Sequence, residues 1–300
     1  MNVIRAGVLG FCEGVRRAVE MAWRAHEQSK PGQAGVYTLG PLIHNSRVLK
    51  SLEDRGIRIL EDGYDLFNEL KPVPKNSTVI IRTHGVSPLA EAELRQPGLR
   101  ILDATCPHVK VSQRKAQSFA ERGYAIFLAG EKGHGEIAGI RGYVEEAYVV
   151  ANPVEAEATA AELSRQDSGA KTVLIGQTTI SPEEYSLIGD AIKRHFPSLE
   201  ILNTICNATA ERQKALRELC GKVDALLIVG DRESSNTRRL LSLALELGKP
   251  AWLVESPEDI PPEIKAYETV GLSAGASAPD DLINVIEETL NDWLGAGDTR

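Results

Sequence analysis

The sequence predicts an α/β fold built from three similar repeats around one centre. Short apolar runs alternate with longer stretches that predict helices, a pattern typical of parallel sheets joined by right-handed crossovers. Three cysteines recur at near-equal intervals: Cys106 follows Cys12 by 106 − 12 = 94 residues, and Cys206 follows Cys106 by 206 − 106 = 100 residues. Each cysteine ends an apolar run with a small or polar break. We therefore expect three αβα repeats related by pseudo-threefold symmetry, in a trefoil-like arrangement.

The same repeat predicts where the parts of the chain begin and end. The expected limits are residues 1–100, 101–198 and 199–281 for the three repeats, and residues 282–300 for a C-terminal helix and tail. Each repeat carries one of the three cysteines near its beginning, and no long linker separates the repeats.

Local patterns predict the elements inside each repeat. Five apolar runs, each followed by glycine or a polar residue, predict buried parallel strands. They cover residues 79–82, 125–130, 173–176, 225–230 and 251–254. Helices are expected at residues 15–28, 112–123, 183–196, 211–222 and 237–248. Residues 1–11 are interpreted as a strand and not as a signal peptide. The segments 69–77 and 255–263 predict surface loops, and 292–300 predicts a frayed end.

Composition excludes several classes of protein. The chain has 300 residues, of which 42% are hydrophobic and 25% are charged, as in ordinary globular proteins. Its net charge of −8 argues against general nucleic-acid binding, which needs a basic face. No run of 18 apolar residues predicts a membrane span. The four cysteines are well separated, so we expect a cytoplasmic protein without disulfides.

The three recurring cysteines are the strongest candidates for a metal site. A lone cysteine is more often a small buried hydrophobic residue, but three at equivalent strand ends favour ligation or catalysis. Zinc usually takes four protein ligands with closely spaced pairs, and this chain has no CxxC pair. Three thiolates without a fourth suit a [4Fe–4S] cluster with one open iron. Cys220 lies in a predicted helix outside the pattern and is expected in the core.

Polar side chains follow the other predicted strands at matching distances from the cysteines. They are His44 and His84, at 32 and 72 residues after Cys12, His134 and Thr178, at 28 and 72 after Cys106, and Ser234 and Ser277, at 28 and 71 after Cys206. Ligands gather at the carboxyl ends of parallel strands, so these side chains are expected at one site. Each histidine could instead be a satisfied core residue. His26 and His195 are expected at the surface, and His108 is ambiguous.

Glu136 and Thr178 are candidates for proton transfer. Glu136 is either a solvated loop carboxylate or, if it faces a closed apolar pocket, a proton donor with a raised pKa. Thr178 could relay a proton or hold a hydroxyl, or could cap the helix that follows. Capping and phosphate binding both use helix N-termini, so the two readings are compatible for a further polar set. That set is Ser234, Ser235, Asn236 and Ser277.

With these residues placed, the chain resembles the 4-hydroxy-3-methylbut-2-enyl diphosphate reductase family of the non-mevalonate isoprenoid pathway. The matching motifs are GFCEGVRRAVE, GPLIHN, RTHGVS, DATCPHVKV, GHGEIAGIRG, GQTTIS, TICNAT, SSNTRRL and SAGASAP. They run in order from residue 10 to residue 279, and together they are highly specific. In that family the residue between the equivalents of His134 and Glu136 is often proline, whereas this chain has Gly135.

The resemblance implies roles for single residues. It assigns the three cluster ligands to Cys12, Cys106 and Cys206. It assigns substrate binding to His44, His84, His134, Thr178, Ser234, Ser235, Asn236 and Ser277. It assigns proton delivery to Glu136 with Thr178.

The resemblance also implies a reaction. The allylic hydroxyl of the diphosphate substrate binds the open iron and leaves as water, giving isopentenyl and dimethylallyl diphosphate. Reduced ferredoxin or flavodoxin would supply the electrons. No GxGxxG motif predicts a nicotinamide or flavin site. Two alternatives stay open at this point: another three-cysteine cluster enzyme of threefold build, such as quinolinate synthase, or a non-catalytic iron–sulfur redox sensor.

Overall fold

A computed structural model describes residues 2–29, 35–60, 73–95 and 98–295. These residues form three four-stranded sheets with parallel pairing throughout. Sheet A contains β1 (Asn2–Arg5), β10 (Ala225–Val229), β11 (Ala251–Val254) and β12 (Thr269–Ala274). Sheet B contains β2 (Val36–Leu39), β3 (Arg58–Leu60), β4 (Thr78–Ile81) and β5 (Arg100–Asp103). Sheet C contains β6 (Ala125–Ala129), β7 (Tyr148–Val150), β8 (Thr172–Gly176) and β9 (Glu200–Ile201).

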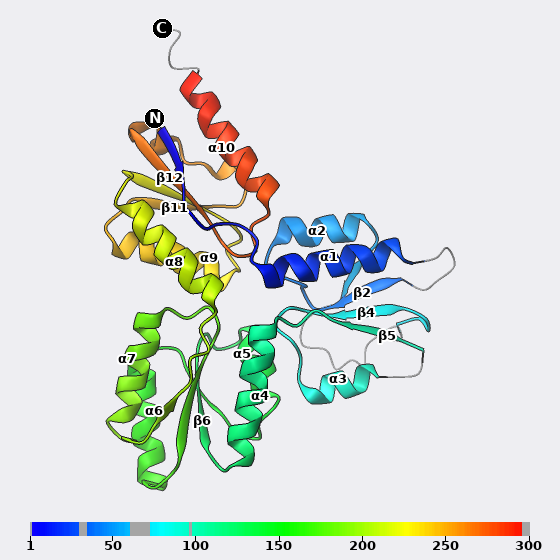
Figure 1. Ribbon diagram of the computed structural model, residues 1–300, viewed down its shortest axis with the longest axis vertical. Coiled ribbons are helices and arrows are strands. Elements are labelled where there is room, and N and C mark those ends of the chain that lie inside the picture. Colours follow the sequence, from blue (N-terminus) through cyan, green and yellow to red (C-terminus); the bar gives the residue numbers. More distant parts are fainter. Residues whose placement is uncertain (1, 30–34, 61–72, 96–97, 296–300) are drawn as a thin grey trace. The chain divides into compact units, whose positions relative to one another are not determined.

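Helices and short 3-10 turns connect these strands (Figure 1). The helices are α1 (Glu13–Glu27), α2 (Ser46–Asp54), α3 (Pro88–Leu94), α4 (Pro107–Glu121), α5 (Gly135–Arg141), α6 (Pro153–Gln166), α7 (Pro182–Lys193), α8 (Asn207–Cys220), α9 (Ser235–Glu246) and α10 (Asp280–Gly295). The 3-10 turns are η1 (Pro257–Asp259) and η2 (Pro262–Ala266). The five predicted helices and five predicted strands all occur at their expected places. None of the described helices combines the length and the apolar character that crossing a membrane requires.

The three sheets share one strand order. It is β3-β2-β4-β5 in sheet B, β7-β6-β8-β9 in sheet C and β11-β10-β12-β1 in sheet A. The fourth place in sheet A is taken by the first strand of the chain, which pairs in parallel with β12. The threefold repeat of the sequence is therefore a threefold repeat of topology, and the predicted α/β class is confirmed.

The sheet limits differ from the predicted repeat limits by one strand. The strand before Cys106 was placed in the second repeat, but β5 pairs with β4 of the preceding segment. In the same way β9, which leads to Cys206, pairs with β8. Each cysteine therefore follows the strand in the fourth place of one sheet, which is β1, β5 or β9. It precedes the helix that leads to the next sheet.

The chain divides into two compact units. The terminal unit comprises Met1–Arg16, Ile43–Lys50 and Asn207–Arg300, and it contains sheet A. The middle unit comprises Arg17–Leu42 and Ser51–Cys206, and it contains sheets B and C.

Sheet C is covered by helices on both faces, which explains its continuous apolar strands. Figure 1 shows α4 and α5 on one side of β6, and α6 and α7 on the other. Ile126 and Leu128 of β6 pack in one cluster with α4 and α5, while Phe127 and Ala129 pack in another with α6 and α7. Successive strand residues point to opposite faces, so a strand covered on both sides must be apolar throughout. Sheet A follows the same rule, with α10 on one face and α8 and α9 on the other.

Two loop predictions need correction. The proline-rich segment 255–263 contains η1 and the start of η2, because its prolines suit the first positions of such turns. Helix α10 continues through Gly295, so the frayed end predicted from residue 292 begins too early, and residues 296–300 lie outside the described residues. Of the predicted loop 69–77, residues 69–72 also lie outside them.

Candidate active site

The backbone places the three recurring cysteines equivalently. Each cysteine donates its backbone N–H to a backbone carbonyl that lies two residues after β12, β4 or β8. These strands hold the third place in the shared strand order. The bonds are Cys12 to Ala276 (3.0 Å), Cys106 to Thr83 (2.9 Å) and Cys206 to Thr178 (2.9 Å). The repeat predicted from spacing is thus present in hydrogen bonds. These bonds align Thr178 with Thr83, so the structural equivalent of His84 is Thr179, one residue away from the predicted match.

The three thiols have the chemistry of ligands. All are partly exposed and positioned immediately before a helix: α1, α4 or α8. Cys106 is the N-cap residue of α4, and the Cys12 Sγ accepts the Val15 N–H at 3.5 Å. Helix N-termini attract negative charge, and the thiolate is the form that binds metals. Cys12 belongs to the terminal unit, and Cys106 and Cys206 belong to the middle unit.

Cys220 differs from these three, as expected. It ends α8 and packs in the apolar cluster with Leu216 and Leu219. Burial raises the pKa of its thiol, which opposes formation of the thiolate. The prediction that Cys220 is a core residue is confirmed.

Glu136 is buried and bonded to Thr178, all within the middle unit. Its side chain is 1% exposed, and it lies in the first turn of α5. Thr178 donates twice, from its N–H to Oε1 and from its Oγ1 to Oε2, both at 2.8 Å. Burial raises the pKa of Glu136 to about 7, although the two bonds from Thr178 act in the opposite direction. The carboxyl can therefore carry and release a proton near neutral pH.

Thr178 does not cap the following helix. Ser181 accepts the Glu184 N–H at 3.1 Å and is the N-cap of α7. The capping alternative for Thr178 is therefore wrong. Gln177, which the sequence analysis did not single out, is fully buried beside it. Its Oε1 accepts the Glu131 N–H at 2.9 Å, and its Nε2 donates to Thr179 Oγ1 at 2.8 Å. A polar residue directly after a buried strand is the signal that could have identified it.

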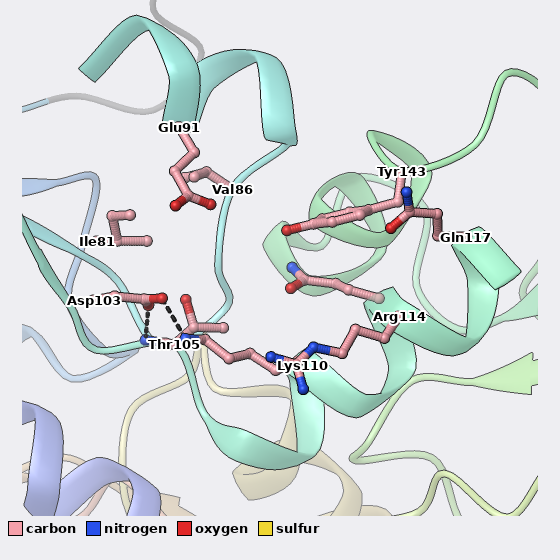
Figure 2. Close-up of a pocket in the computed structure, with 10 residues that line it drawn as sticks. Ile81, Val86, Glu91, Asp103, Thr105, Lys110, Arg114, Gln117 and Tyr143 are labelled. Carbon is pink, nitrogen blue, oxygen red and sulfur yellow. Dashed lines mark hydrogen bonds and ion pairs between the residues drawn. The ribbon is translucent and has the colours of Figure 1, made fainter. Parts of the chain in front are cut away.

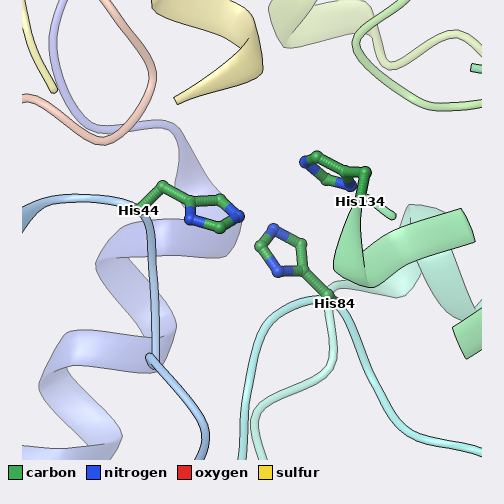
Figure 3. A group of neighbouring side chains, drawn as sticks. All are labelled: His44, His84 and His134. Carbon is green, nitrogen blue, oxygen red and sulfur yellow. The ribbon is translucent and has the colours of Figure 1, made fainter. Parts of the chain in front are cut away.

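Two of the three predicted histidines meet in the middle unit (Figure 3). The rings of His84 and His134 are 5.0 Å apart and edge-on. His134 caps α5, because its Nδ1 accepts the Glu136 N–H at 3.1 Å. The neutral imidazole then carries its proton on Nε2, where it can donate to a ligand. His44, also drawn in Figure 3, belongs to the terminal unit.

The close approach of two side chains explains why position 135 is a glycine. A Cβ at this position would lie 3.2 Å from Arg82 Nη2 and 3.3 Å from His84 Nδ1. The missing side chain therefore lets a guanidinium and an imidazole approach the backbone between His134 and Glu136. A larger residue would displace one of them.

The serine-rich motif forms the start of α9 in the terminal unit. Ser234 is the N-cap and accepts the Thr237 N–H at 3.4 Å, and Ser235 and Asn236 are the first two helical residues. Thr237 packs closely below them: a Cβ at Gly275 would lie 2.1 Å from its Oγ1, and one at Gly230 2.7 Å. The two glycines let the first turn of α9 lie against the ends of β10 and β12.

Asn236 and Ser277 complete the polar set of the terminal unit. Asn236 is 4% exposed, and within the described part of the chain neither its Oδ1 nor its Nδ2 has a hydrogen-bond partner. Such a buried amide is costly unless a ligand satisfies it. Ser277 Oγ donates to the His44 carbonyl at 2.8 Å, which ties the histidine segment to the loop after β12.

The other histidines are less involved. His108 is exposed on the first turn of α4. His195 Nε2 lies 2.6 Å from a Glu157 carboxylate oxygen, so it forms a peripheral ion pair when protonated. His26 lies in the last turn of α1 and is half-buried.

A polar pocket of about 270 Å³ lies elsewhere in the middle unit (Figure 2). Lys110 pairs with Asp103, and Asp103 also accepts the Thr105 N–H at 2.8 Å. Burial alone raises the pKa of Asp103, but these contacts outweigh it and lower the pKa. Glu91, on the opposite wall, pairs with Arg95 at 2.7 Å. The pocket contains none of the predicted site residues, and its acidic groups are already matched.

Comparison with known proteins decides the family. The sequence profile of the LytB protein family matches residues 3–291. This chain belongs to the LytB protein family. Among LytB relatives, a Treponema denticola protein named 4-hydroxy-3-methylbut-2-enyl diphosphate reductase is 42% identical over 290 residues, covering 97% of this chain and 99% of the relative. An Aquifex aeolicus protein of the same name is 35% identical over 293 residues, covering 97% and 96%.

Solved LytB-type structures share the fold. The E-1-hydroxy-2-methyl-but-2-enyl-4-diphosphate reductase of Plasmodium falciparum matches with a TM-score of 0.85 and 29% identity, over 97% of this chain and 87% of that one. A structure described as (E)-4-hydroxy-3-methyl-but-2-enyl diphosphate reductase, the terminal enzyme of the non-mevalonate pathway, matches with a TM-score of 0.69 and 34% identity, over 97% and 99%. The resemblance inferred from the motifs is confirmed.

Proposed function

We propose that this chain removes the hydroxyl group of 4-hydroxy-3-methylbut-2-enyl diphosphate reductively, giving isopentenyl and dimethylallyl diphosphate. The observation that carries the proposal is the Glu136–Thr178 pair, a buried carboxyl whose pKa of about 7 suits proton delivery. Its position beside His134, together with the names of the LytB relatives, supports this substrate over other hydroxylated diphosphates.

The proposed reaction consumes two electrons and two protons. The C–O bond of the allylic carbon breaks, a C–H bond forms, and the oxygen leaves as water. Glu136 supplies a proton, and Thr178 Oγ1, bonded to the carboxyl at 2.8 Å, passes it to the substrate hydroxyl. Burial keeps bulk water from competing for that proton.

In this proposal the diphosphate is held by the polar side chains that the resemblance assigns to substrate binding. They are His44, His84, His134, Ser234, Ser235, Asn236 and Ser277. The start of α9 attracts negative charge, and the unsatisfied Asn236 amide can donate to a phosphate oxygen. Few lysines are needed, which fits a net charge of −8.

The three equivalent thiols fit an iron–sulfur cluster. Cys12, Cys106 and Cys206 would hold a [4Fe–4S] cluster, and their partly exposed thiols at three equivalent helix starts are the supporting observation. When bound, the cluster supplies electrons and, at the iron without a protein ligand, a Lewis-acidic position. A reduced ferredoxin or flavodoxin would deliver the electrons singly in the cytoplasm.

Anaerobic purification with metal analysis tests the cluster. We expect about four irons and four sulfides per chain. Cys106→Ser should lose the cluster, and the matched control Cys220→Ser should keep it, because Cys220 is buried in the apolar core. Zinc, iron without sulfide, or equal losses from both variants would overturn the cluster assignment.

An anaerobic assay with a chemical reductant tests the reaction. The purified protein should convert the hydroxylated diphosphate to both products, and it should be inactive in a parallel quinolinate synthase assay. A cluster-loaded protein that leaves the diphosphate unchanged would refute the proposed function and favour a redox-sensing role.

A further inference from the structure

Asp231 is a buried carboxylate that joins two polar segments of the terminal unit. It follows Gly230 at the end of β10 and is 6% exposed. Its Oδ2 accepts the Ser46 N–H at 2.8 Å, and its Oδ1 accepts the Glu233 N–H at 2.8 Å. Ser46 lies two residues after His44, and Glu233 lies directly before Ser234. One side chain therefore connects the His44 segment to the loop that begins α9.

The bond to Ser46 is not needed to cap α2. Asn45 already serves that purpose, because its Oδ1 accepts the Val48 N–H at 3.0 Å. The Asp231 carboxylate instead holds the first residue of α2 from another segment of the chain. Ser277 Oγ fixes the same segment from another side through the His44 carbonyl. The backbone directly after the His44 side chain is thus held at two points, the His44 carbonyl and the Ser46 N–H.

The charge of Asp231 also acts on His44. Burial alone raises the pKa of Asp231, but the hydrogen bonds from Ser46 and Glu233 and the charge of His44 outweigh it and lower the pKa. Asp231 is therefore an anion at neutral pH. The carboxylate and His44 therefore interact electrostatically as well as through the backbone.

The equivalent loops of the other sheets carry other residues at the position of Asp231. Gly40, Gly130 and Gly230 each stand four residues before His44, His134 and Ser234, so the loops have equal length. The residue after the glycine is Pro41 in the first loop and Glu131 in the second. Proline has no side-chain acceptor, and in the second loop the Glu131 backbone N–H is bound by Gln177. An aspartate at this position is specific to the loop that carries the serines.

We propose that Asp231 is a positioning residue that holds His44 and the Ser234–Asn236 loop in the arrangement that binds the diphosphate of the substrate. This inference rests on the proposed function and adds to it a determinant of substrate binding. Asp231 itself would touch neither the diphosphate nor the reacting carbon.

Diphosphate binding to the cluster-loaded protein tests the inference. Asp231→Ala removes both acceptors, and Asp231→Asn keeps the shape but loses the charge and one acceptor. We expect the Kd for inorganic diphosphate, measured by calorimetry, and the KM for the substrate to rise about tenfold or more in Asp231→Ala, and less in Asp231→Asn. The kcat should stay within about threefold, because Glu136 and Thr178 are untouched.

Asp259→Ala is the matched control. The Asp259 Oδ2 also accepts two backbone N–H groups, from Glu255 and Ser256 at 3.0 Å, but in the turn η1, which contains neither His44 nor the serines. Asp259→Ala should leave Kd and KM unchanged. Equal effects of Asp231→Ala and Asp259→Ala, or a fall in kcat at constant KM, would overturn the positioning role.

Two further outcomes separate this inference from the proposed function. If Asp231→Ala fails to fold, the well-folded Asp231→Asn decides, and unchanged Kd and KM in it would overturn the inference alone. If the wild-type protein neither binds diphosphate nor turns over the substrate, the proposed function fails, and this inference fails with it.

Discussion

The loops 130–136 and 230–236 have the same backbone plan and different chemistry. Each follows the second strand of its sheet order, begins with glycine and ends in the first turn of a helix. His134 caps one helix and Ser234 caps the other. Glu136 and Asn236 then occupy the same helical position and are almost equally buried, at 1% and 4% exposed.

The difference lies in what satisfies these two buried groups. The Glu136 carboxylate receives two hydrogen bonds from Thr178, whereas the Asn236 amide has no partner among the described residues. When the protein itself supplies the hydrogen bonds of a buried carboxyl group, it also influences the pKa of that group. A group that the protein leaves unsatisfied gains only when a ligand arrives. In the proposed function, the same loop would serve proton delivery in one unit and ligand binding in the other.

The largest expected effect is that of Glu136→Gln. The amide keeps the shape but cannot deliver a proton, so kcat should fall by roughly 10²- to 10⁴-fold with little change in KM. Anaerobic turnover with saturating reductant measures this. Glu162→Gln is the control, because Glu162 is an exposed residue paired with Arg165. A kcat close to that of wild type would assign proton delivery to another group.

Asn236→Ala should affect binding instead. Loss of the amide should raise the KM for the substrate and the Kd for inorganic diphosphate by roughly tenfold to a hundredfold. The thermal midpoint should change little, because the amide makes no hydrogen bond within the described part of the chain. A marked loss of stability with unchanged Kd would show that Asn236 is a structural residue, and the contrast with Glu136 would disappear.

Gly275→Ala should destabilise the α9 loop by roughly 1 to 3 kcal/mol, because the new methyl would overlap Thr237. Gly133→Ala, in the loop before α5, has nothing within 4 Å of the new Cβ and only the strain of a φ of +85°. It should cost about 1 kcal/mol. Denaturant titrations compare the two variants. Equal costs would mean that the first turn of α9 moves freely.

The smallest expected effect is a shift in pH dependence. The acid form of Glu136 is the donor, so kcat/KM should fall as pH rises through about 7. Thr178→Val removes the proposed proton relay, so its kcat should fall. It also removes a hydrogen bond that lowers the pKa of Glu136, so in the remaining activity the fall should move to higher pH, by about one unit or less. Thr178→Ser keeps the hydroxyl and should keep the profile. A shift to lower pH in Thr178→Val would contradict this account of the carboxyl.

Long-range pairing explains which predictions needed correction. Thr178 looked like a helix cap because its neighbours form good cap sequence, but its true partner lies 42 residues away at Glu136. The spacing assigns the strands before Cys106 and Cys206 to the repeats they open, whereas each pairs with the strand that precedes it. The contact of Asp231 with Ser46 spans 185 residues and leaves no local pattern in the sequence.

The sequence by itself determined the α/β class, the threefold repeat, the equivalent cysteines and the family. These properties depend on local periodicity and on spacing along the chain, which survive without any contact being known. Only the tertiary structure decided that β1 completes the sheet of the last repeat, that Thr178 bonds to Glu136, and that the buried Asn236 amide has no partner among the residues the structure describes. Those facts depend on contacts between groups that are distant in the sequence. Such contacts exclude water and supply hydrogen-bond partners, and they exist only in the packed chain.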